Sequence, residues 1–430
     1  MQDTVSENKT FIELSTENLT LSDEQQHALE TLRSGENVFL TGGAGVGKST
    51  VVKELIEALS PKEMPVLAST GAAAVLMGGR TFHSFFGIGI MEGGPAATFE
   101  RAAKNSKLMK RLKQVEGVII DEISMIPGQA LEVAERLAAK ARDSQLPWGG
   151  MRMIVVGDFA QLPPVQRGSG PKDWSFLNSS WEKSQFIKME LNINQRVREH
   201  QAESTFISIL NKIRQGVIDS SVTEFLNEHT KHHDEESSGT RLFPRREQSE
   251  MFNQKKLNEI NETEVSFDSI YLGEEKDVEA LKRTVPVPEK LTLKIGCEIL
   301  FLKNDPQRRW VNGTRGTVVS IEQEYIKVEK RSGREVKVDK TQFSMLDADG
   351  NVKASVIQFP VALAYATTIH KSQGATLDEL WCDLSALWEP GQGYVALSRL
   401  RESSGLHILR WSPGSFKVDL QVRQFMNWSV

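Results

Sequence analysis

Short apolar runs alternate with longer amphipathic stretches through the first half of the chain. The apolar runs lie at residues 37–40, 66–69, 117–120 and 153–157. Ahead of the first run, Ser22 and Gln25 have the spacing of a capping box, which marks the start of a helix. Strand-like runs that alternate with helices favour a parallel sheet covered on both faces. We therefore predict an α/β domain over residues 18–195, preceded by a flexible lead at 1–17.

The hydrophobic period changes in the second half of the chain. From residue 291 to 345, apolar and polar residues alternate with a period near two, and Ser332 and Gly333 mark a hairpin turn. This pattern predicts a small antiparallel barrel, and the α/β pattern resumes at about residue 356. We expect a second α/β domain over 196–302 and 357–430, with the barrel inserted at 303–356.

Residues 86–114 interrupt the first α/β pattern and are predicted to form a small insertion on the first domain. The segment is rich in glycine at first and then strongly basic. A charge run usually forms a solvated helix face, whereas a nucleic-acid contact would use the same charges. The sequence leaves both interpretations open. The basic residues are Arg101, Lys104, Lys107, Lys110, Arg111 and Lys113.

The composition is that of an ordinary globular protein, with 39% hydrophobic and 25% charged residues among 430. No apolar run approaches the ~18–20 residues that a membrane span needs. The first twenty residues carry one lysine and four acids, unlike a signal or transit peptide. Cys297 and Cys382 are too far apart for a zinc motif. We expect an intracellular protein without a membrane partner, cytoplasmic in a bacterium or phage and nuclear in a eukaryote.

A net charge of −5 does not indicate nucleic-acid binding, although a local basic track would be enough. The stronger signal is TGGAGVGKST at 41–50, between a predicted strand and a predicted helix. It satisfies G-x-x-x-x-G-K-[ST], whose glycines let backbone N–H groups wrap around phosphates. Lys48 would reach the β- and γ-phosphates and Ser49 would ligate Mg²⁺. The expected ATP-binding residues are Gly42, Gly43, Ala44, Gly45, Val46, Gly47, Lys48, Ser49 and Thr50.

Two further strand ends carry candidate catalytic residues. The segment VIIDEIS at 118–124 delivers Asp121 and Glu122 at the carboxyl end of a strand, where α/β sheets bind ligands. Asp121 suits the Mg²⁺ shell, and Glu122 is the natural base or positioning group for the attacking water. In GDFAQLPPV at 157–165, Gln161 is placed to contact a γ-phosphate or that water.

With these motifs the chain resembles superfamily 1 helicases, specifically the PIF (petite integration frequency) group, with RecD-like helicases close by. The resemblance implies two RecA-like P-loop domains, with an inserted Src-homology-like barrel in which NGTRG at 312–316 matches a common turn. Asn194 and Gln195 depart from the family, which often has an aromatic there. The matching segments are LSDEQ at 21–25, ASTGAAAVLMGGRTFHSFFGIG at 68–89, LPWGGMRMIVVGDFAQLPPV at 146–165, ELNINQR at 190–196, ATTIHKSQGATLD at 366–378 and GQGYVALSRL at 391–400.

The resemblance also implies roles around the nucleotide. Gln25 matches the glutamine that reads adenine in this family, and Gln373 and Gly374 would face the nucleotide. Arg196 and Arg399 would reach across a cleft to the γ-phosphate. An arginine finger of this kind stabilises transition-state charge and makes closure of the cleft depend on ATP.

Motor domains of this group bind the nucleic-acid strand across both α/β domains. Small hydroxyls, histidines and lysine suit phosphate and sugar contacts, which position the strand without reading its sequence. Phe85 and Phe86 would offer a stacking face or pack in the core, and we expect core packing for one of them. The expected strand contacts are Thr70, Gly71, Thr81, His83, Ser84, Phe85, Thr368, His370, Lys371 and Ser372.

The sequence therefore predicts an ATP-dependent 5′-to-3′ DNA helicase, a monomeric motor that serves replication, repair, recombination or telomere-type maintenance. Its expected partners are single-stranded DNA and single/double-strand junctions, with G-quadruplexes and RNA–DNA hybrids as further candidates. A P-loop kinase or metabolic ATPase would not explain HKSQG and YVALSR. A non-catalytic clamp would not need the acids and arginines. A translocase that does not unwind duplex, and an RNA track, remain open alternatives.

Overall fold

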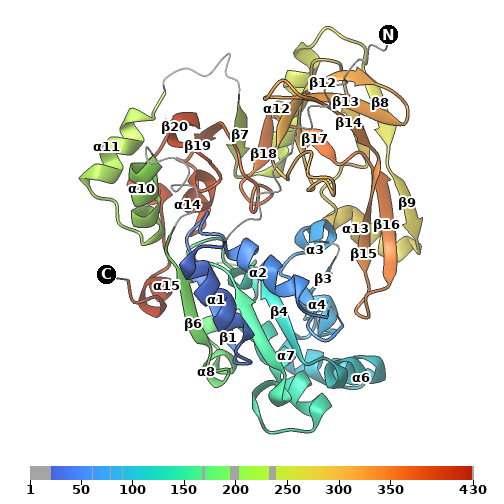
Figure 1. Ribbon diagram of the computed structural model, residues 1–430, viewed down its shortest axis with the longest axis vertical. Helices are drawn as coiled ribbons and strands as arrows, with labels where there is room; N and C mark the ends of the chain where they lie inside the picture. Colours follow the sequence, from blue (N-terminus) through green and yellow to red (C-terminus); the bar gives the residue numbers. More distant parts are fainter. Residues whose placement is uncertain are drawn as a thin grey trace, which may run out of the picture.

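The computed structural model describes residues 21–60, 62–77, 79–89, 91–166, 170–193, 203–231 and 239–428. Two parallel sheets and a region of antiparallel strands divide this part of the chain (Figure 1). In the view of Figure 1 the first sheet lies below, with the second sheet and the antiparallel strands above it. Among the described residues, no helix has the length and apolar character needed to cross a bilayer.

The first sheet has six parallel strands in the order β3-β2-β4-β5-β1-β6. The four apolar runs of the first domain all form strands, as predicted. This confirms the prediction of a parallel α/β domain. The strands end within a residue or two of the predicted positions, and β1 extends to Gly42. Their bounds are β1 Val38–Gly42, β2 Val66–Ala68, β3 Arg80–Thr81, β4 Gly117–Asp121, β5 Arg152–Val156 and β6 Ile187–Leu191.

Helices cover both faces of this sheet because strand residues alternate between its faces. On β1, Val38 and Leu40 pack with α1 and α2, whereas Phe39 packs on the opposite face with α7. The predicted capping box is confirmed: the Ser22 hydroxyl accepts from the Gln25 N–H, and Gln25 Oε1 accepts from the Ser22 N–H at 3.0 Å. The helices are α1 Asp23–Arg33, α2 Lys48–Glu57, α3 Gly71–Met77, α4 Phe82–Phe85, α5 Gly94–Ala103, α6 Ser106–Gln114, α7 Gly128–Arg142 and α8 Ser179–Lys183.

The basic part of the predicted insertion forms α5 and α6. Both helices pack against α7 through buried residues such as Ala102, Leu108 and Leu112. Arg111 turns inward, donating to the Phe85 carbonyl at 2.7 Å and pairing with Asp349 at 2.6 Å. Its charge is therefore used within the fold, while Lys104, Lys107 and Lys110 lie on the exposed side.

The second parallel sheet has four strands in the order β18-β7-β19-β20. Its core joins apolar residues of α10, α11 and α14 to the strands. The C-terminal α15 crosses back to the first domain, where Val422 and Met426 enter the core. The bounds are α10 Ser204–Arg214, α11 Ser220–Glu228, β7 Thr240–Phe243, α12 Arg246–Glu259, β18 Ala366–Thr368, β19 Leu380–Asp383, α14 Gln392–Leu397, β20 Leu406–Arg410 and α15 Leu420–Phe425.

Antiparallel strands occupy residues 265–363, a wider span than the expected 303–356, and the second parallel sheet resumes only at Ala366. They form a five-stranded sheet in the order β14-β13-β12-β11-β17, a three-stranded sheet in the order β15-β16-β9, and the pair β10-β8. The predicted Ser332–Gly333 turn joins β13 and β14. The bounds are β8 Val265–Asp268, β9 Ile270–Gly273, α13 Glu275–Thr284, β10 Lys290–Leu293, β11 Glu298–Phe301, β12 Arg315–Ile321, β13 Tyr325–Lys330, β14 Glu335–Asp339, β15 Thr341–Leu346, β16 Val352–Gln358 and β17 Val361–Leu363.

This antiparallel region also contacts the first domain. Val75 of α3 packs in one buried cluster with Leu281 of α13 and Phe343 of β15. The turn between β15 and β16 receives the Arg80 guanidinium on the Ala348 carbonyl. Figure 1 shows α13 and the β15–β16 hairpin beside α3. The first domain is therefore in direct contact with the antiparallel region.

Candidate nucleotide and DNA site

The P-loop lies between β1 and α2, as the sequence predicts. A side chain at Gly42 would place its Cβ 2.4 Å from the Leu191 carbonyl oxygen, so only glycine fits there. Gly47, at φ 87°, is in the left-handed conformation that glycine allows. Lys48 Nζ donates to the carbonyls of Gly42 at 2.8 Å and Gly43 at 2.9 Å, which places the ammonium inside the curve of the loop. The remaining loop residues Ala44, Gly45, Val46, Ser49 and Thr50 lie on the same turn and first helical turn.

Asp121 is the last residue of β4 and Glu122 follows it, at the carboxyl end of the sheet. Burial raises the pKa of both carboxyls. For Glu122 the neighbouring Asp121 charge adds to burial and brings the pKa to about 7, against the opposing charges of Lys48 and Arg399. Glu122 also has a left-handed backbone, with φ 55°, which directs a non-glycine side chain in an uncommon way. A half-buried carboxyl with a pKa near neutrality suits a general base.

The residues present fit Mg²⁺ and ATP. Ser49 offers a hydroxyl at the start of α2 and Asp121 a carboxylate at the end of β4, and oxygen ligands of this kind suit Mg²⁺. The Asp121 charge acts on Lys48, so the two strand ends share one site. Burial lowers the pKa of Lys48, and the largest opposing charge is Asp158. ATP and Mg²⁺ remain the expected occupants of this site.

Predicted residues from both parallel domains meet around the P-loop. Gln161, after β5, accepts a hydrogen bond from Gln373 Nε2 at 3.4 Å, which joins the two domains. Gly374 is exposed next to it, with φ 77°. Gln25 donates to the Val46 carbonyl at 3.2 Å, so the predicted adenine-reading residue touches the P-loop itself. These placements agree with nucleotide contacts, which stay predictions.

Arg399 follows α14 and is 6% exposed. Its Nε donates to the Val395 carbonyl at 3.0 Å and its Nη2 to the Ser398 hydroxyl at 2.9 Å. Its charge reaches Glu122, where it opposes the rise in pKa. An arginine of the second domain therefore faces the acidic pair of the first. Arg196, the other predicted finger, lies outside the described residues.

The structure adds three residues that the sequence motifs did not single out, namely Asp158, Arg214 and Tyr394. Asp158 and Tyr394 stand inside quoted motifs, so a signal was present for both. Arg214 ends α10 and carries no motif signal. The three are buried together at the boundary between the domains, beside Gly43 and Ala44.

Five of the predicted strand contacts on the first domain are partly exposed, and the sixth, Phe85, is buried. Thr70 and Thr81 cap α3 and α4 by accepting from the Ala73 and Ser84 N–H groups. A side chain at Gly71 would lie 2.6 Å from Thr284 of α13, so the antiparallel region covers this position. His83 and Ser84 are partly exposed, and burial lowers the pKa of His83.

The prediction of a stacking face at Phe85 is wrong. Phe85 and Phe86 are both 0% exposed and lie in the main core of the first domain, where their rings contact each other. Arg80 and Arg111 lie over the Phe85 ring. Both aromatics are therefore core residues, because the end of α4 directs their rings into the core of the first domain.

On the second domain, the prediction that the Thr368 and Ser372 side chains contact the nucleic-acid strand is wrong. Both are buried, and their hydroxyls hold the turn after β18: Thr368 accepts from the Lys371 N–H and Ser372 donates to the Ile369 carbonyl. This turn exposes His370 and Lys371. Burial of part of its surface lowers the pKa of Lys371, and Arg246 adds to that effect. His370 and Lys371 thus remain the candidate contacts on this domain.

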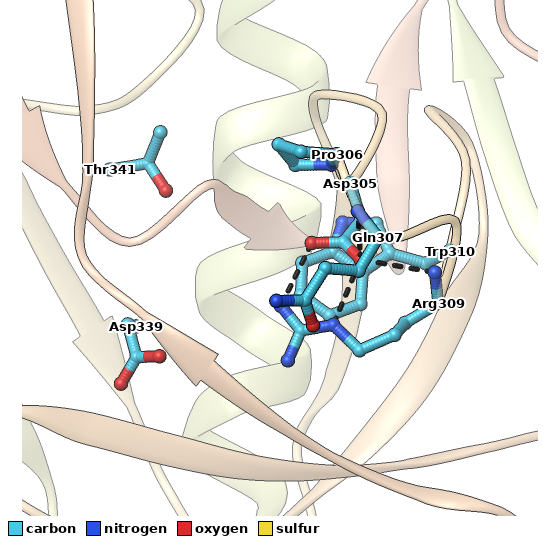
Figure 2. Close-up of a pocket in the computed structure, with 7 residues that line it drawn as sticks. All are labelled: Asp305, Pro306, Gln307, Arg309, Trp310, Asp339 and Thr341. Carbon is cyan, nitrogen blue, oxygen red and sulfur yellow. Dashed lines mark hydrogen bonds and ion pairs between the residues drawn. The ribbon is translucent and has the colours of Figure 1, made fainter.

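A separate hollow of about 210 Å³ lies in the antiparallel region (Figure 2). Asp305 accepts from Arg309 Nε and Nη2, each at 2.8 Å, and Arg309 lies over the Trp310 ring. The residues that line the hollow all lie between positions 305 and 341. It is therefore distinct from the nucleotide site.

A P-loop, an acidic pair at the end of β4 and an arginine from a second parallel domain define a two-domain P-loop NTPase motor. Within that class the chain belongs to the PIF1-like helicase family, whose sequence model matches residues 20–224. A second model, described as DNA helicase Pif1, 2B domain, matches residues 278–321. That match falls within the antiparallel region.

The chain is 62% identical to the "ATP-dependent DNA helicase Pif1" of Bdellovibrio bacteriovorus, over 95% of this chain and 92% of that protein. It is 34% identical to the human "ATP-dependent DNA helicase PIF1", over 94% of this chain but 63% of that longer protein. Bacteroides sp Pif1 in complex with ADP-AlF4 matches with a TM-score of 0.82 at 29% identity, over 95% of this chain and 97% of that one. Bacteroides Pif1 bound to ssDNA matches with a TM-score of 0.64 at 29% identity, over the same shares.

Proposed function

We propose that this protein is an ATP-dependent DNA helicase that translocates 5′-to-3′ on single-stranded DNA and unwinds duplex or structured DNA. The observation that carries the proposal is the environment of Glu122. Its pKa is lowered by the charge of Lys48 in its own domain and by that of Arg399 in the other, against the effect of burial. A base that both domains influence makes hydrolysis depend on how the domains close. The names and bound groups of the relatives support DNA as the track.

The chain's own residues divide the work of hydrolysis. Bound ATP with Mg²⁺ would supply the phosphoryl group and the charge neutralisation that its transfer needs. The P-loop amides and Lys48 would hold the phosphates, with Ser49 and Asp121 as protein ligands for the metal. Glu122 would take a proton from the attacking water, which Gln161 would help to orient. Arg399, with Arg196 as a second candidate, would meet the charge that develops on the γ-phosphate.

The DNA track is proposed to run over accessible residues of both parallel domains. His83 and Ser84 would contact the strand on the first domain, and His370 and Lys371 on the second. These groups suit phosphate and sugar, so they would bind the strand without reading its bases.

Single/double-strand junctions are expected substrates because the protein would unwind duplex, and G-quadruplexes and RNA–DNA hybrids are further substrates to compare. We further propose a monomeric cytoplasmic motor with an antiparallel insert over about residues 265–363.

ATP hydrolysis with matched single-stranded DNA and RNA tests the choice of track. We expect DNA to stimulate turnover more strongly than RNA of the same sequence and length, with no stimulation in Lys48→Ala. Equal stimulation by both would replace DNA with a general single-strand track. Absence of any stimulation would contradict a nucleic-acid motor.

A further inference from the structure

A buried ion pair joins the two parallel domains beside the P-loop. Asp158, directly after β5 and Gly157, is 0% exposed, and Arg214 at the end of α10 is 5% exposed. Arg214 Nε lies 3.1 Å from Asp158 Oδ1 and 3.0 Å from Oδ2, and its Nη1 donates to Glu190 Oε1 at 3.2 Å. The Arg214 guanidinium also lies 4.9 Å from the Trp428 ring. Asp158 and Glu190 belong to the first domain and Arg214 to the second.

The Tyr394 hydroxyl connects this pair to the P-loop. It donates to Asp158 Oδ2 at 3.3 Å and accepts from the Ala44 N–H at 2.9 Å. Burial, followed by the Asp158 charge, raises the pKa of this hydroxyl above its usual value, so it stays protonated and can make both bonds. One phenol oxygen therefore bridges a loop amide and a carboxylate that already binds an arginine.

The P-loop is packed against the same cluster. A Cβ at Gly43 would lie 3.4 Å from Asn211 Oδ1, 3.6 Å from the Tyr394 oxygen and 3.9 Å from Arg214 Cδ. The Asp158 and Arg214 charges both act on Lys48, with opposite sign. Lys48 is the residue that reaches the β- and γ-phosphates in such loops. The cluster thus lies against the part of the P-loop next to the expected position of the γ-phosphate.

We propose that Asp158 and Arg214 are positioning residues that hold the Tyr394 hydroxyl on the Ala44 amide, forming a relay from the P-loop to the second motor domain. The relay rests on the proposed function, because only a nucleotide-driven motor needs to transmit the state of its P-loop. Burying an ion pair gives little net stability compared with apolar packing, so stability alone is a weak reason for it. A relay that joins the two domains through direct hydrogen bonds responds to a shift of the loop by displacing α10 and α14.

Tyr394→Phe tests the relay because it removes one oxygen and keeps the ring. The matched control is Tyr365→Phe, since the Tyr365 hydroxyl also accepts from a backbone amide, that of Glu298 on β11 at 3.0 Å, away from the P-loop. The dissociation constant of a fluorescent single-stranded DNA is measured with ADP and with ADP-AlF4. In the wild type and in Tyr365→Phe we expect the two nucleotides to give different DNA affinities. In Tyr394→Phe that difference should shrink about fivefold, in the range of typical coupling between sites.

Further readouts separate a relay from a structural role. Tyr394→Phe should lower kcat with little change in KM, and ADP affinity and the thermal midpoint should match those of the wild type. Arg214→Lys, which keeps the charge but loses the planar fork, should also shrink the ADP-to-ADP-AlF4 difference in DNA affinity. An unchanged difference in Tyr394→Phe would overturn the relay. So would parallel losses of ADP affinity, ADP-AlF4 affinity and thermal midpoint, which would show a structural role. Failure of the proposed function would instead appear in the wild type, as a DNA affinity indifferent to nucleotide, and would remove the relay with it.

Discussion

Glu122 owes its proposed role to its surroundings, because the same residue type on an exposed helix would be an ordinary surface acid. It follows Asp121 at the end of β4, in a left-handed backbone conformation. Burial and the Asp121 charge bring its pKa to about 7. At the residue scale, the site therefore consists of an acid, Glu122, with a pKa near neutrality, and a lysine, Lys48, that is hydrogen-bonded to the carbonyls of the P-loop.

Removing the carboxylate of Glu122 should stop turnover without emptying the site. We expect Glu122→Gln to lose about 10²-fold or more in kcat while it still binds ATP, since a positioned base typically contributes that much. Lys48→Ala should instead lose nucleotide affinity. Steady-state hydrolysis and nucleotide titration distinguish the two. Glu262→Gln, at an exposed position, is the control, and wild-type turnover in Glu122→Gln would remove the assignment.

The pH dependence of hydrolysis follows from the same pKa. A general base works when deprotonated, so activity should be full above a pKa of about 7 and fall as pH drops through it. The measurement is kcat/KM for ATP from pH 5.5 to 8.5, which reports groups of the free enzyme. A profile that stays flat between about pH 6 and 8 would contradict Glu122 as the base.

Much of the residue-scale site could be predicted, because spacing ties P-loop and strand-end residues to fixed places on a parallel sheet. Arg214 could not, since its partner Asp158 is 56 positions away in sequence and no motif marks either as a pair. Phe85, Thr368 and Ser372 show the opposite error. Their types suit DNA contact, but only the fold determines that α4 and the turn after β18 bury them.

Element boundaries explain where the sequence predicted the fold less well. The four predicted strands of the first sheet, β1, β2, β4 and β5, are mostly apolar and buried, so their places were clear. Strands β8 and β9 expose most of their residues, which hides them among loop-like polar stretches. The antiparallel region consequently begins earlier than predicted. The β15–β16 hairpin binds α3 of the first domain, a contact between elements far apart in sequence.

The turn after β18 should act as a DNA contact through its exposed residues. We expect Lys371→Ala to weaken single-stranded DNA binding and to reduce the salt slope of log K by about 1, as for loss of one phosphate contact. Affinity is measured at several salt concentrations. Lys53→Ala, on the exposed side of α2 with its side chain 65% exposed, is the control. An unchanged salt slope in Lys371→Ala would place the strand elsewhere.

At the scale of the whole molecule, two parallel domains enclose the P-loop, and each supplies charges that the other needs. Arg399 affects Glu122 across the boundary, and Gln161 meets Gln373 there. The C-terminal α15 binds the second domain back to the first through Val422 and Met426. Such an arrangement converts a change at the nucleotide into a change in how the domains pack.

Arg399→Ala should separate DNA binding from movement. The side chain serves charge at the γ-phosphate in our proposal, so single-stranded DNA affinity should stay while ATP-driven unwinding is lost. Fluorescence anisotropy and strand separation measure the two properties on one preparation. Arg401→Ala, two residues along and exposed, is the control. Normal unwinding by Arg399→Ala would show that it is not a finger.

Direction of unwinding tests the central proposal most directly. The measurement is ATP-dependent strand separation on paired fluorescent duplexes that carry either a 5′ or a 3′ single-stranded tail of the same length. We predict efficient unwinding from the 5′ tail, none from the 3′ tail, and none from either with Lys48→Ala. Efficient unwinding from the 3′ tail alone would contradict a 5′-to-3′ helicase, and failure on both tails in the presence of ATP would contradict a helicase altogether.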